Sequence, residues 1–100
     1  MRPIYMVALD KYRPAVLITR EEVLDFREQI TVAPITGTVR GMSTEVLVGP
    51  ANGIDKGGAV HCDDLNTVRR EKIGQFVGYL HDDQEGALAE AIIAGFDLDV

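Results

Sequence analysis

An arginine stands beside the start of a short, entirely apolar stretch. Residues 14–18, Pro-Ala-Val-Leu-Ile, carry no hydrogen-bonding side chain and include two β-branched residues, which predicts a strand buried on both faces. Pro14 suits the first position of such a strand because it has no N–H to give to a ladder. The guanidinium of Arg13 keeps its charge in a protein and is rarely buried unpaired. We therefore expect Arg13 to pair with a carboxylate or to bind an anionic ligand.

A histidine and an aspartate share one face of a later strand, which we predict over residues 58–65. Alternation along that strand places His61 and Asp63 on one side, with Cys62 and Asp64 on the other. Histidine is the side chain whose unperturbed titration range lies near neutral pH, and a neighbouring carboxylate can orient its ring. The pair is therefore a candidate for proton transfer. A half-exposed core neighbour remains an alternative for His61, and a turn cap remains one for Asp63.

Length and charge limit the number of domains and the kinds of ligand that the chain can have. The chain has 100 residues, 46% of them hydrophobic, which is enough for one domain, residues 1–100, with a core of its own. The formal net charge is −6, and residues 82–100 hold six acidic side chains with no Lys or Arg, so residues 1–81 are neutral. Phosphate binding normally leaves a basic footprint. The acidity belongs to the C-terminal segment, so the neutral body still allows a nucleic-acid ligand.

Two further features concern location and redox state. The apolar run at residues 4–9 is too short for a signal peptide or a membrane span, and no later run reaches that length, so we expect a cytoplasmic protein with no membrane partner. A single cysteine, Cys62, allows no internal disulfide, and we expect it to be a small buried hydrophobic residue.

Short strands dominate the elements that must position these groups. We predict strands over residues 4–9, 13–18, 30–36, 43–48, 58–65 and 75–80, the first two paired antiparallel across residues 10–12. Pro34 places its strand at a sheet edge or at a bulge near the strand end. The strand at 43–48 alternates so that Glu45 and Leu47 share its exposed side.

Helices are few in the predicted fold. Residues 19–29 are typical of a short helix or helical loop, and residues 68–73 of a single helical turn. A final helix follows His81, with Asp82 and Glu85 spaced as a capping box and Leu88, Ile92 and Phe96 on one stripe. This order indicates a mainly β fold, a small curved antiparallel barrel with a C-terminal helix.

Read in this order, the strands resemble the MazF/PemK family, the toxins of bacterial toxin–antitoxin modules. The matching pieces are residues 4–10, 13–18, 32–36 and 62–68 and the final strand and helix. The pieces Arg-Pro-Ala at 13–15 and Ala-Pro-Ile-Thr at 33–36 are the most specific of them. The resemblance implies an SH3-like, plasmid-toxin barrel, a homodimer, a cognate antitoxin as partner, and endoribonuclease activity on single-stranded RNA that needs no metal or cofactor.

The resemblance also implies site residues. The family's catalytic arginine falls on Arg13, its catalytic threonine on Thr36 and a third aspartate position on Asp63. In some members an arginine two residues before that aspartate takes part in cleavage, and His61 stands there in this chain. We expect the RNA to contact Lys11, Tyr12, Arg40, Asp64 and Asn66, with Tyr12 as a stacking ring or, equally, an aromatic at the barrel rim.

Three departures from the family pattern bear on substrate choice and on activity. The long polar loop usual between the first two strands shrinks here to residues 10–12, and Asp64 and Asn66 stand where Gln and Arg are usual. In relatives, that loop and that arginine help to hold RNA or antitoxin.

The chemistry of metal-free RNA cleavage suits the matched residues. A ribose 2′-hydroxyl attacks the adjacent phosphorus, which requires a base, an acid for the leaving oxygen and positive charge at the phosphate. Arg13 would grip phosphoryl oxygens with its fork, Thr36 would donate a hydrogen bond, and His61 would act as general acid or base with support from Asp63. A structural salt bridge of Arg13, for instance to Asp63, remains the alternative.

Two other functions stay open from the sequence. An inactive or catalytically weak relative would only bind the antitoxin, and the short loop and the missing arginine favour this. A gyrase-poisoning toxin of the CcdB type would share the fold. For the nuclease, the neutral body predicts an RNA affinity that falls only modestly with salt, with unpaired bases stacked and read in a groove.

Overall fold

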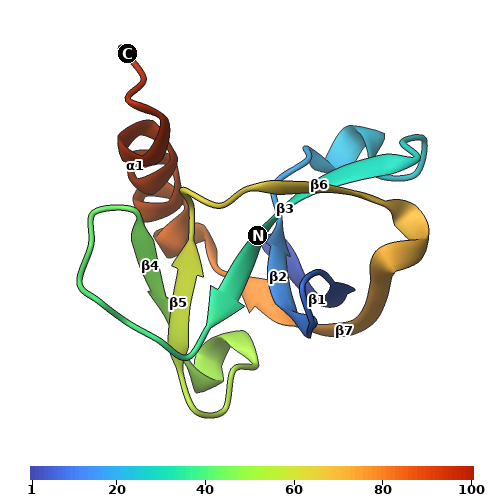
Figure 1. Ribbon diagram of the computed structural model, residues 1–100, viewed down its shortest axis with the longest axis horizontal. Helices are drawn as coiled ribbons and strands as arrows, with labels where there is room; N and C mark the ends of the chain where they lie inside the picture. The colour runs from blue at the N-terminus through green and yellow to red at the C-terminus, as the bar shows by residue number, and fades with distance from the viewer.

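A single curled sheet forms most of the computed structural model, which describes residues 1–100 (Figure 1). The sheet has seven strands in the order β4-β5-β3-β2-β1-β7, with β6 paired to β3 beside this path. The strands are β1 (Arg2–Ala8), β2 (Tyr12–Leu17), β3 (Gln29–Thr36), β4 (Glu45–Val48), β5 (Gly58–His61), β6 (Asn66–Arg69) and β7 (Ile73–Leu80). Every pair is antiparallel. The predicted mainly β fold is therefore confirmed.

Strand β2 lies at the centre of this sheet and is buried on both faces, as its apolar sequence predicts. It pairs with β1 on one side and with β3 on the other. Val16 belongs to the larger core cluster, whereas Ala15 and Leu17 belong to a second, smaller one on the opposite face. A strand with core on both faces is held in register because a slip by one residue would reverse every side chain. It is therefore a firm support for Arg13.

Strand β3 changes partners along its length. Its first half, from Gln29 to Val32, pairs with β6, and its last two residues, Ile35 and Thr36, pair with β5. Pro34 lies in the gap between these two pairings, where a missing N–H costs no ladder hydrogen bond on that side. Because β3 has neighbours on both sides, the edge alternative predicted for Pro34 is wrong, and the proline lies instead near the strand end, where the pairing of β3 changes.

The segments between the long strands differ in part from the predicted pattern. One 3₁₀ turn, η1 (Glu21–Val23), lies in the segment predicted as a short helix or helical loop, and η2 (Pro50–Asn52) follows β4. Residues 68 and 69 are not helical but belong to β6, because β3 offers residues 66–69 a hydrogen-bonding edge. Only η3 (Arg70–Lys72) remains of the helical turn predicted over residues 68–73. Strand β5 ends at His61, four residues before the predicted end.

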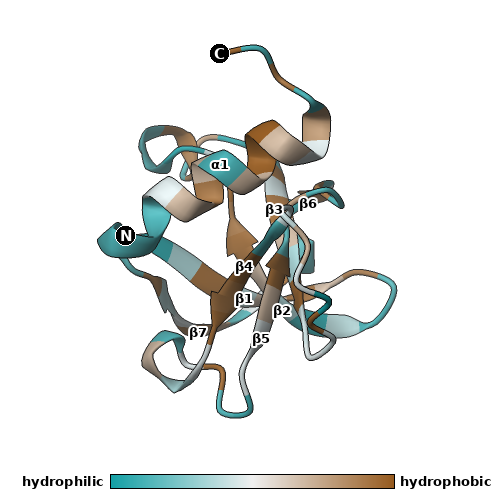
Figure 2. Cartoon of the chain, turned by 90° about the vertical axis from the view of Figure 1, so that its left-hand side faces the viewer, coloured by the Kyte–Doolittle hydropathy of each residue, from teal (hydrophilic) through white to brown (hydrophobic).

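The C-terminal helix α1 (Glu85–Phe96) lies across one end of the strands (Figure 2). Leu88 and Ala91 are buried in the larger core cluster, and Ile92 packs against it, so the helix covers that end of the core. Phe96, predicted on the same stripe, is half exposed because the helix extends beyond the sheet. No helix of the structure is long and apolar enough to cross a membrane.

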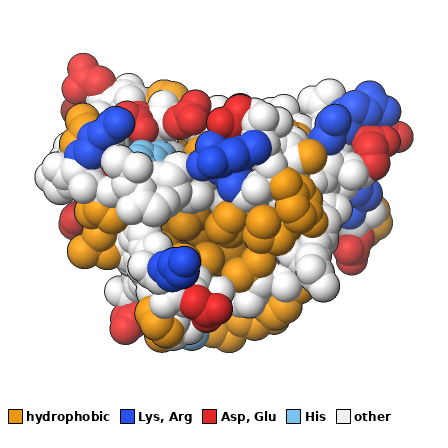
Figure 3. Space-filling model, turned by 60° about the horizontal axis from the view of Figure 1, so that its bottom comes forward, with side chains coloured by type: hydrophobic (Ala, Val, Ile, Leu, Met, Phe, Trp, Pro, Cys, Tyr) orange, Lys and Arg blue, Asp and Glu red, His pale blue; other side chains and the backbone are white.

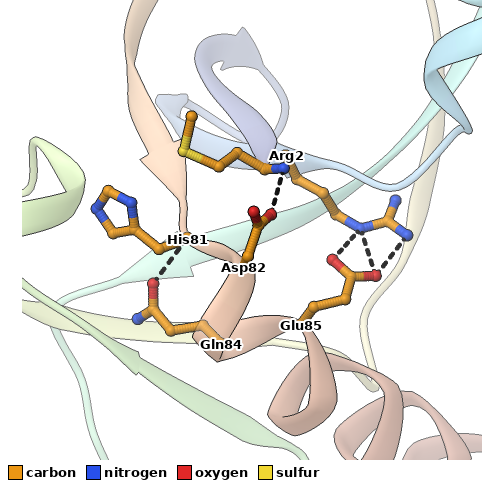
Figure 4. A network of polar contacts seen from close by, with 6 residues as sticks. Arg2, His81, Asp82, Gln84 and Glu85 are labelled. Carbon is orange, nitrogen blue, oxygen red and sulfur yellow. Dashed lines mark hydrogen bonds and ion pairs between the residues drawn. The ribbon is translucent and has the colours of Figure 1, made fainter.

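The start of α1 is tied to the N-terminus rather than closed by the predicted capping box (Figure 4). The Met1 amino group bonds the Asp82 carboxylate at 2.6 Å, and Arg2 bonds both oxygens of Glu85 through Nε at 2.9 and 3.1 Å. Within η4 (Asp82–Gln84), the side-chain oxygen of Gln84 instead accepts the His81 backbone N–H at 2.9 Å. His81 thus belongs to the cap region, as predicted, but Asp82 and Glu85 do not cap each other.

Candidate active site

One pocket of about 690 Å³ gathers almost every residue singled out from the sequence. It lies where β2 begins and where β3 and β5 end, and the segments 9–11, 38–42 and 63–66 meet these strands there. The predicted site residues that line it are Lys11, Arg13, Thr36, Arg40, His61, Asp63, Asp64 and Asn66. Tyr12 is the one predicted residue outside it.

The sheet register explains why three of these residues meet. Ala15 of β2 is opposite Pro34 of β3, so the same register continued by two residues places Arg13 level with Thr36. On the other side of β3, Thr36 is opposite Ala59 of β5, which makes His61 its diagonal neighbour on the same face. Three neighbouring strands thus present an arginine, a threonine and a histidine to one cavity.

Arg13 forms a two-point ion pair with Asp10 in the β1–β2 turn. Its Nε bonds Oδ1 at 3.0 Å and its Nη2 bonds Oδ2 at 2.8 Å. The hydrogen bond and charge of Arg13 lower the pKa of Asp10, and Asp10 raises the pKa of Arg13 in return. The predicted alternative partner, Asp63, is not the one observed. A guanidinium has five N–H donors and Asp10 takes two, so the edge formed by Nη1 and Nη2 remains available to an anion.

Thr36 and His61 are in direct contact. The Thr36 hydroxyl lies 2.8 Å from His61 Nε2, and both groups are near the Thr38 carbonyl oxygen, at 3.4 Å from Oγ1 and 3.3 Å from Nε2. Only 18% of the His61 side chain is exposed. The hydroxyl and the ring therefore act as one unit whose proton positions depend on each other.

A residue that the sequence analysis left on an exposed strand face, Glu45, completes this unit. Its side chain is only 3% exposed, and Oε2 lies 3.9 Å from His61 Nε2. The carboxylate accepts the backbone N–H of Arg40 at 3.1 Å and of Met42 at 3.0 Å, so the loop before β4 folds over it. The pairing of β4 with β5 would have identified Glu45 as a site residue, because it places Glu45 directly opposite His61.

The two aspartates after β5 do not follow the predicted alternation. The strand ends at His61, and Asp63 and Asp64 both line the pocket from the following turn. No hydrogen bond joins Asp63 to His61; the carboxylate nearest the His61 ring is that of Glu45. Cys62, between His61 and Asp63 in the sequence, is fully buried, as predicted. Burial together with the Asp63 charge raises the pKa of its thiol to about 11.

Tyr12 faces away from the pocket. As the residue before Arg13 in the same strand, it projects to the opposite side. Its hydroxyl accepts the Gln75 backbone N–H at 3.3 Å and packs on Gly74, where a side chain would collide with it. This position fits an aromatic at the barrel rim, the alternative to a stacking platform for RNA.

The family of this chain follows from its sequence match. Residues 3–96 match the family described as PemK-like, MazF-like toxin of type II toxin–antitoxin system. Because the match covers nearly all of the sequence, the chain belongs to this family, and the predicted membership is confirmed.

The relatives that it resembles are named as ribonucleases and toxins. The chain is 50% identical over 99 residues to Endoribonuclease MazF3 of Mycobacterium tuberculosis, covering 99% of this chain and 96% of that protein. The solved structure titled Mycobacterium tuberculosis toxin MazF-mt6 superposes with a TM-score of 0.97 at 48% identity, covering 99% of this chain and all of that one. The prediction of a toxin endoribonuclease of the MazF type is thereby confirmed.

A more distant neighbour supports the fold alone. The structure titled Endoribonuclease in complex with its cognate antitoxin from Mycobacterial species has a TM-score of 0.87 at 18% identity, covering 98% of this chain and 94% of that one. The barrel thus persists where most side chains differ, so the role of individual residues must be argued from this chain's own pocket.

Proposed function

We propose that this toxin cuts single-stranded RNA internally by attack of a ribose 2′-hydroxyl on the adjacent phosphorus, with Arg13, Thr36 and His61 around the reacting phosphate. The observation that carries the proposal is the convergence of these three side chains, from three neighbouring strands, on one pocket. A guanidinium, a hydroxyl and an imidazole supply charge, a hydrogen bond and a proton carrier, which is what this reaction needs without a metal.

The proposed reaction exchanges one phosphorus–oxygen bond for another. The 2′-oxygen bonds to phosphorus as it loses its proton, the bond to the 5′-oxygen breaks, and that oxygen gains a proton. The products are a 2′,3′-cyclic phosphate and a 5′-hydroxyl. The free edge of Arg13 would bind two phosphoryl oxygens as negative charge grows on them, and Thr36 would donate a hydrogen bond to one of them. His61 would carry the proton as general acid or base.

The remaining pocket residues would hold the flanking nucleotides. Three basic side chains line the pocket beside three carboxylates, those of Lys11, Arg13, Arg40, Asp10, Asp63 and Asp64. The balance of charge limits the number of phosphates that the pocket neutralises, so RNA affinity should fall only modestly as salt rises. Asp64 and Asn66 would instead read unpaired base edges with their acceptors and donors.

The direct test uses purified protein, a single-stranded RNA and EDTA, followed by mapping of the new ends. We expect internal cuts that leave a 5′-hydroxyl and a cyclic phosphate, and no loss of rate on metal removal. Cuts that leave a 3′-hydroxyl, or a requirement for Mg²⁺, would reject the mechanism. Intact RNA together with tight antitoxin binding would instead favour the inactive antitoxin-binding alternative. The family match gives no support to a CcdB-like gyrase poison.

Partners form the second part of the proposal. A homodimer would cover apolar surface that the single chain leaves exposed: Figure 3 shows an apolar area between charged side chains, and Phe76 and Tyr79, stacked edge to face, are both partly exposed. We place the protein in the cytoplasm, where a cognate antitoxin would cover the pocket. Sedimentation equilibrium tests the dimer, and a purely monomeric species at micromolar concentration would reject it.

A further inference from the structure

The proton on His61 is constrained by what surrounds one of its ring nitrogens. Nε2 lies 2.8 Å from Thr36 Oγ1, 3.3 Å from the Thr38 carbonyl oxygen and 3.9 Å from Glu45 Oε2. A carbonyl and a carboxylate can only accept hydrogen bonds. A lone pair on Nε2 would therefore face two other electron-rich oxygens, whereas an N–H there is attracted by all three. The geometry thus favours the hydrogen on Nε2.

That hydrogen decides what the Thr36 hydroxyl can do. A hydroxyl has one hydrogen and two acceptor lone pairs. When Nε2–H donates to Thr36 Oγ1, the hydroxyl hydrogen is not used by the ring. Its only other contact within the protein is the Thr38 carbonyl oxygen at 3.4 Å, too long for a strong hydrogen bond. Thr36 can then donate to an incoming phosphate.

Glu45 holds its charge beside the ring despite being buried. Burial alone raises its pKa, but hydrogen bonds from the Met42, Arg40 and Gly41 backbone and the nearby His61 together bring the pKa below its ordinary value. The other charged groups that share the pocket with His61 are Asp10, Lys11, Arg13, Arg40, Asp63 and Asp64. No other carboxylate lies within ion-pair distance of a ring nitrogen, whereas Glu45 Oε2 lies 3.9 Å from Nε2, so Glu45 has the most direct influence on the ring.

We propose that Glu45 is a positioning residue of this active site: its carboxylate keeps the His61 hydrogen on Nε2, which directs the Thr36 hydroxyl hydrogen to the RNA phosphate. In the neutral ring the nitrogen left to exchange a proton with RNA is Nδ1, which has no hydrogen-bond partner in the protein. The part of this inference that concerns RNA rests on the proposed cleavage mechanism, whereas the tautomer does not.

The tautomer can be measured without any RNA. In ¹⁵N-labelled protein at a pH where the ring is neutral, we expect His61 to show a protonated Nε2 and an unprotonated Nδ1. Replacement of the carboxylate in Glu45→Gln should shift the ring toward a mixture of tautomers. His81, whose Nε2 lies 2.8 Å from the Ala51 carbonyl oxygen, is an internal control that should not change. A wild-type ring protonated on Nδ1 would overturn the inference even if the variant failed to fold, and so would an unchanged tautomer in the variant.

Cleavage kinetics separate positioning from a purely structural role. We expect Glu45→Gln to lower kcat by about 10–100-fold with little change in KM, as loss of an orienting carboxylate commonly does. Glu45→Asp should restore part of the rate. Glu22→Gln, at an exposed carboxylate outside the pocket, is the matched control.

A double variant tests whether Glu45 acts through His61 or only holds the loop before β4. If Glu45 acts through His61, adding Glu45→Gln to a His61→Asn variant should cost little more than His61→Asn alone. Additive losses would show that Glu45 only holds the loop of residues 40–42, and would overturn the inference. Should the wild-type protein cleave no RNA at all, the proposed function fails while the tautomer measurement still decides this proposal.

Discussion

Two arginines of this small protein form similar ion pairs in very different surroundings. Arg2 binds both oxygens of Glu85 and also donates to the Ile18 carbonyl oxygen at 2.8 Å, so it joins β1, the end of β2 and the start of α1. Arg13 binds both oxygens of Asp10, three residues away in its own hairpin. The first pair spans 83 residues of sequence and fixes the helix to the sheet. The second fixes only a side chain.

The difference shows that ion-pair geometry does not identify function. Both guanidinium groups make two-point contacts below 3.2 Å, and both are less exposed than their carboxylate partners. What distinguishes Arg13 is its neighbourhood, a pocket shared with Thr36 and His61 and a guanidinium edge with no protein partner. In Arg2, by contrast, Nε, Nη1 and Nη2 all donate hydrogen bonds to acceptors within the protein. Substitutions at the two positions should therefore separate activity from stability.

The largest expected effect is on cleavage in Arg13→Lys. A lysine keeps the charge but loses the planar fork, so the rate should fall by about 10²–10³-fold, the usual cost of one transition-state donor. The free energy of unfolding should change by less than about 0.5 kcal/mol, because the Asp10 pair is close to the surface. Arg2→Lys is the matched control and should cleave at nearly the wild-type rate. Equal losses of activity in both variants would show that the two arginines do not differ in function.

The next effect is expected at the threonine hydroxyl. Thr36→Val keeps the shape of the side chain and removes the donor, so we expect kcat to fall by about 10–100-fold. Thr67→Val in β6 is the control, since that hydroxyl bonds only Thr31 at 2.7 Å outside the pocket. Single-turnover rates on a short RNA measure both. An unaffected Thr36→Val enzyme would show that Arg13 works without the hydroxyl.

A smaller effect should appear in the stability of Arg2→Ala. The variant loses the link between β1 and α1, and we expect its free energy of unfolding in urea to fall by about 1 kcal/mol, at the upper end for a partly exposed pair. Arg69→Ala removes an exposed pair with Glu71 and should change stability little. Cleavage should survive in both. Loss of cleavage in folded Arg2→Ala would mean that the helix attachment shapes the pocket.

The smallest effect concerns pH. The Arg2 hydrogen bond lowers the pKa of Glu85 from its ordinary 4.5, and the N-terminal amine lowers that of Asp82 from 3.8. A carboxyl with a lowered folded pKa stabilises the fold above its unfolded pKa and loses this contribution as pH falls through the folded value. Urea midpoints should therefore decline below about pH 4.5. The decline should be shallower in Glu85→Gln, and an identical pH dependence would exclude this pair as a contributor.

Much of the site was predictable because its residues follow strong local patterns. The apolar strand after Arg13 and the end of β3 at Thr36 are set by sequence, and the family resemblance supplied their roles. Glu45 was missed because alternation along β4 places it on an exposed side, and only the loop of residues 37–44 folding over it buries the carboxylate. Strand β6 was missed for a similar reason, since its extended form depends on the distant edge of β3.

The partner change along β3 has a consequence for how such a protein could diversify. Because β5 and β6 pair with different halves of β3, the sheet splits into two branches at Pro34. The pocket lies between these branches, close to the point where they separate. Residues 62–65 bridge the two branches. Lengthening or shortening this bridge would change the width of the opening while the catalytic side chains stayed on their strands. Substrate preference can thus evolve through spacing, separately from the reaction.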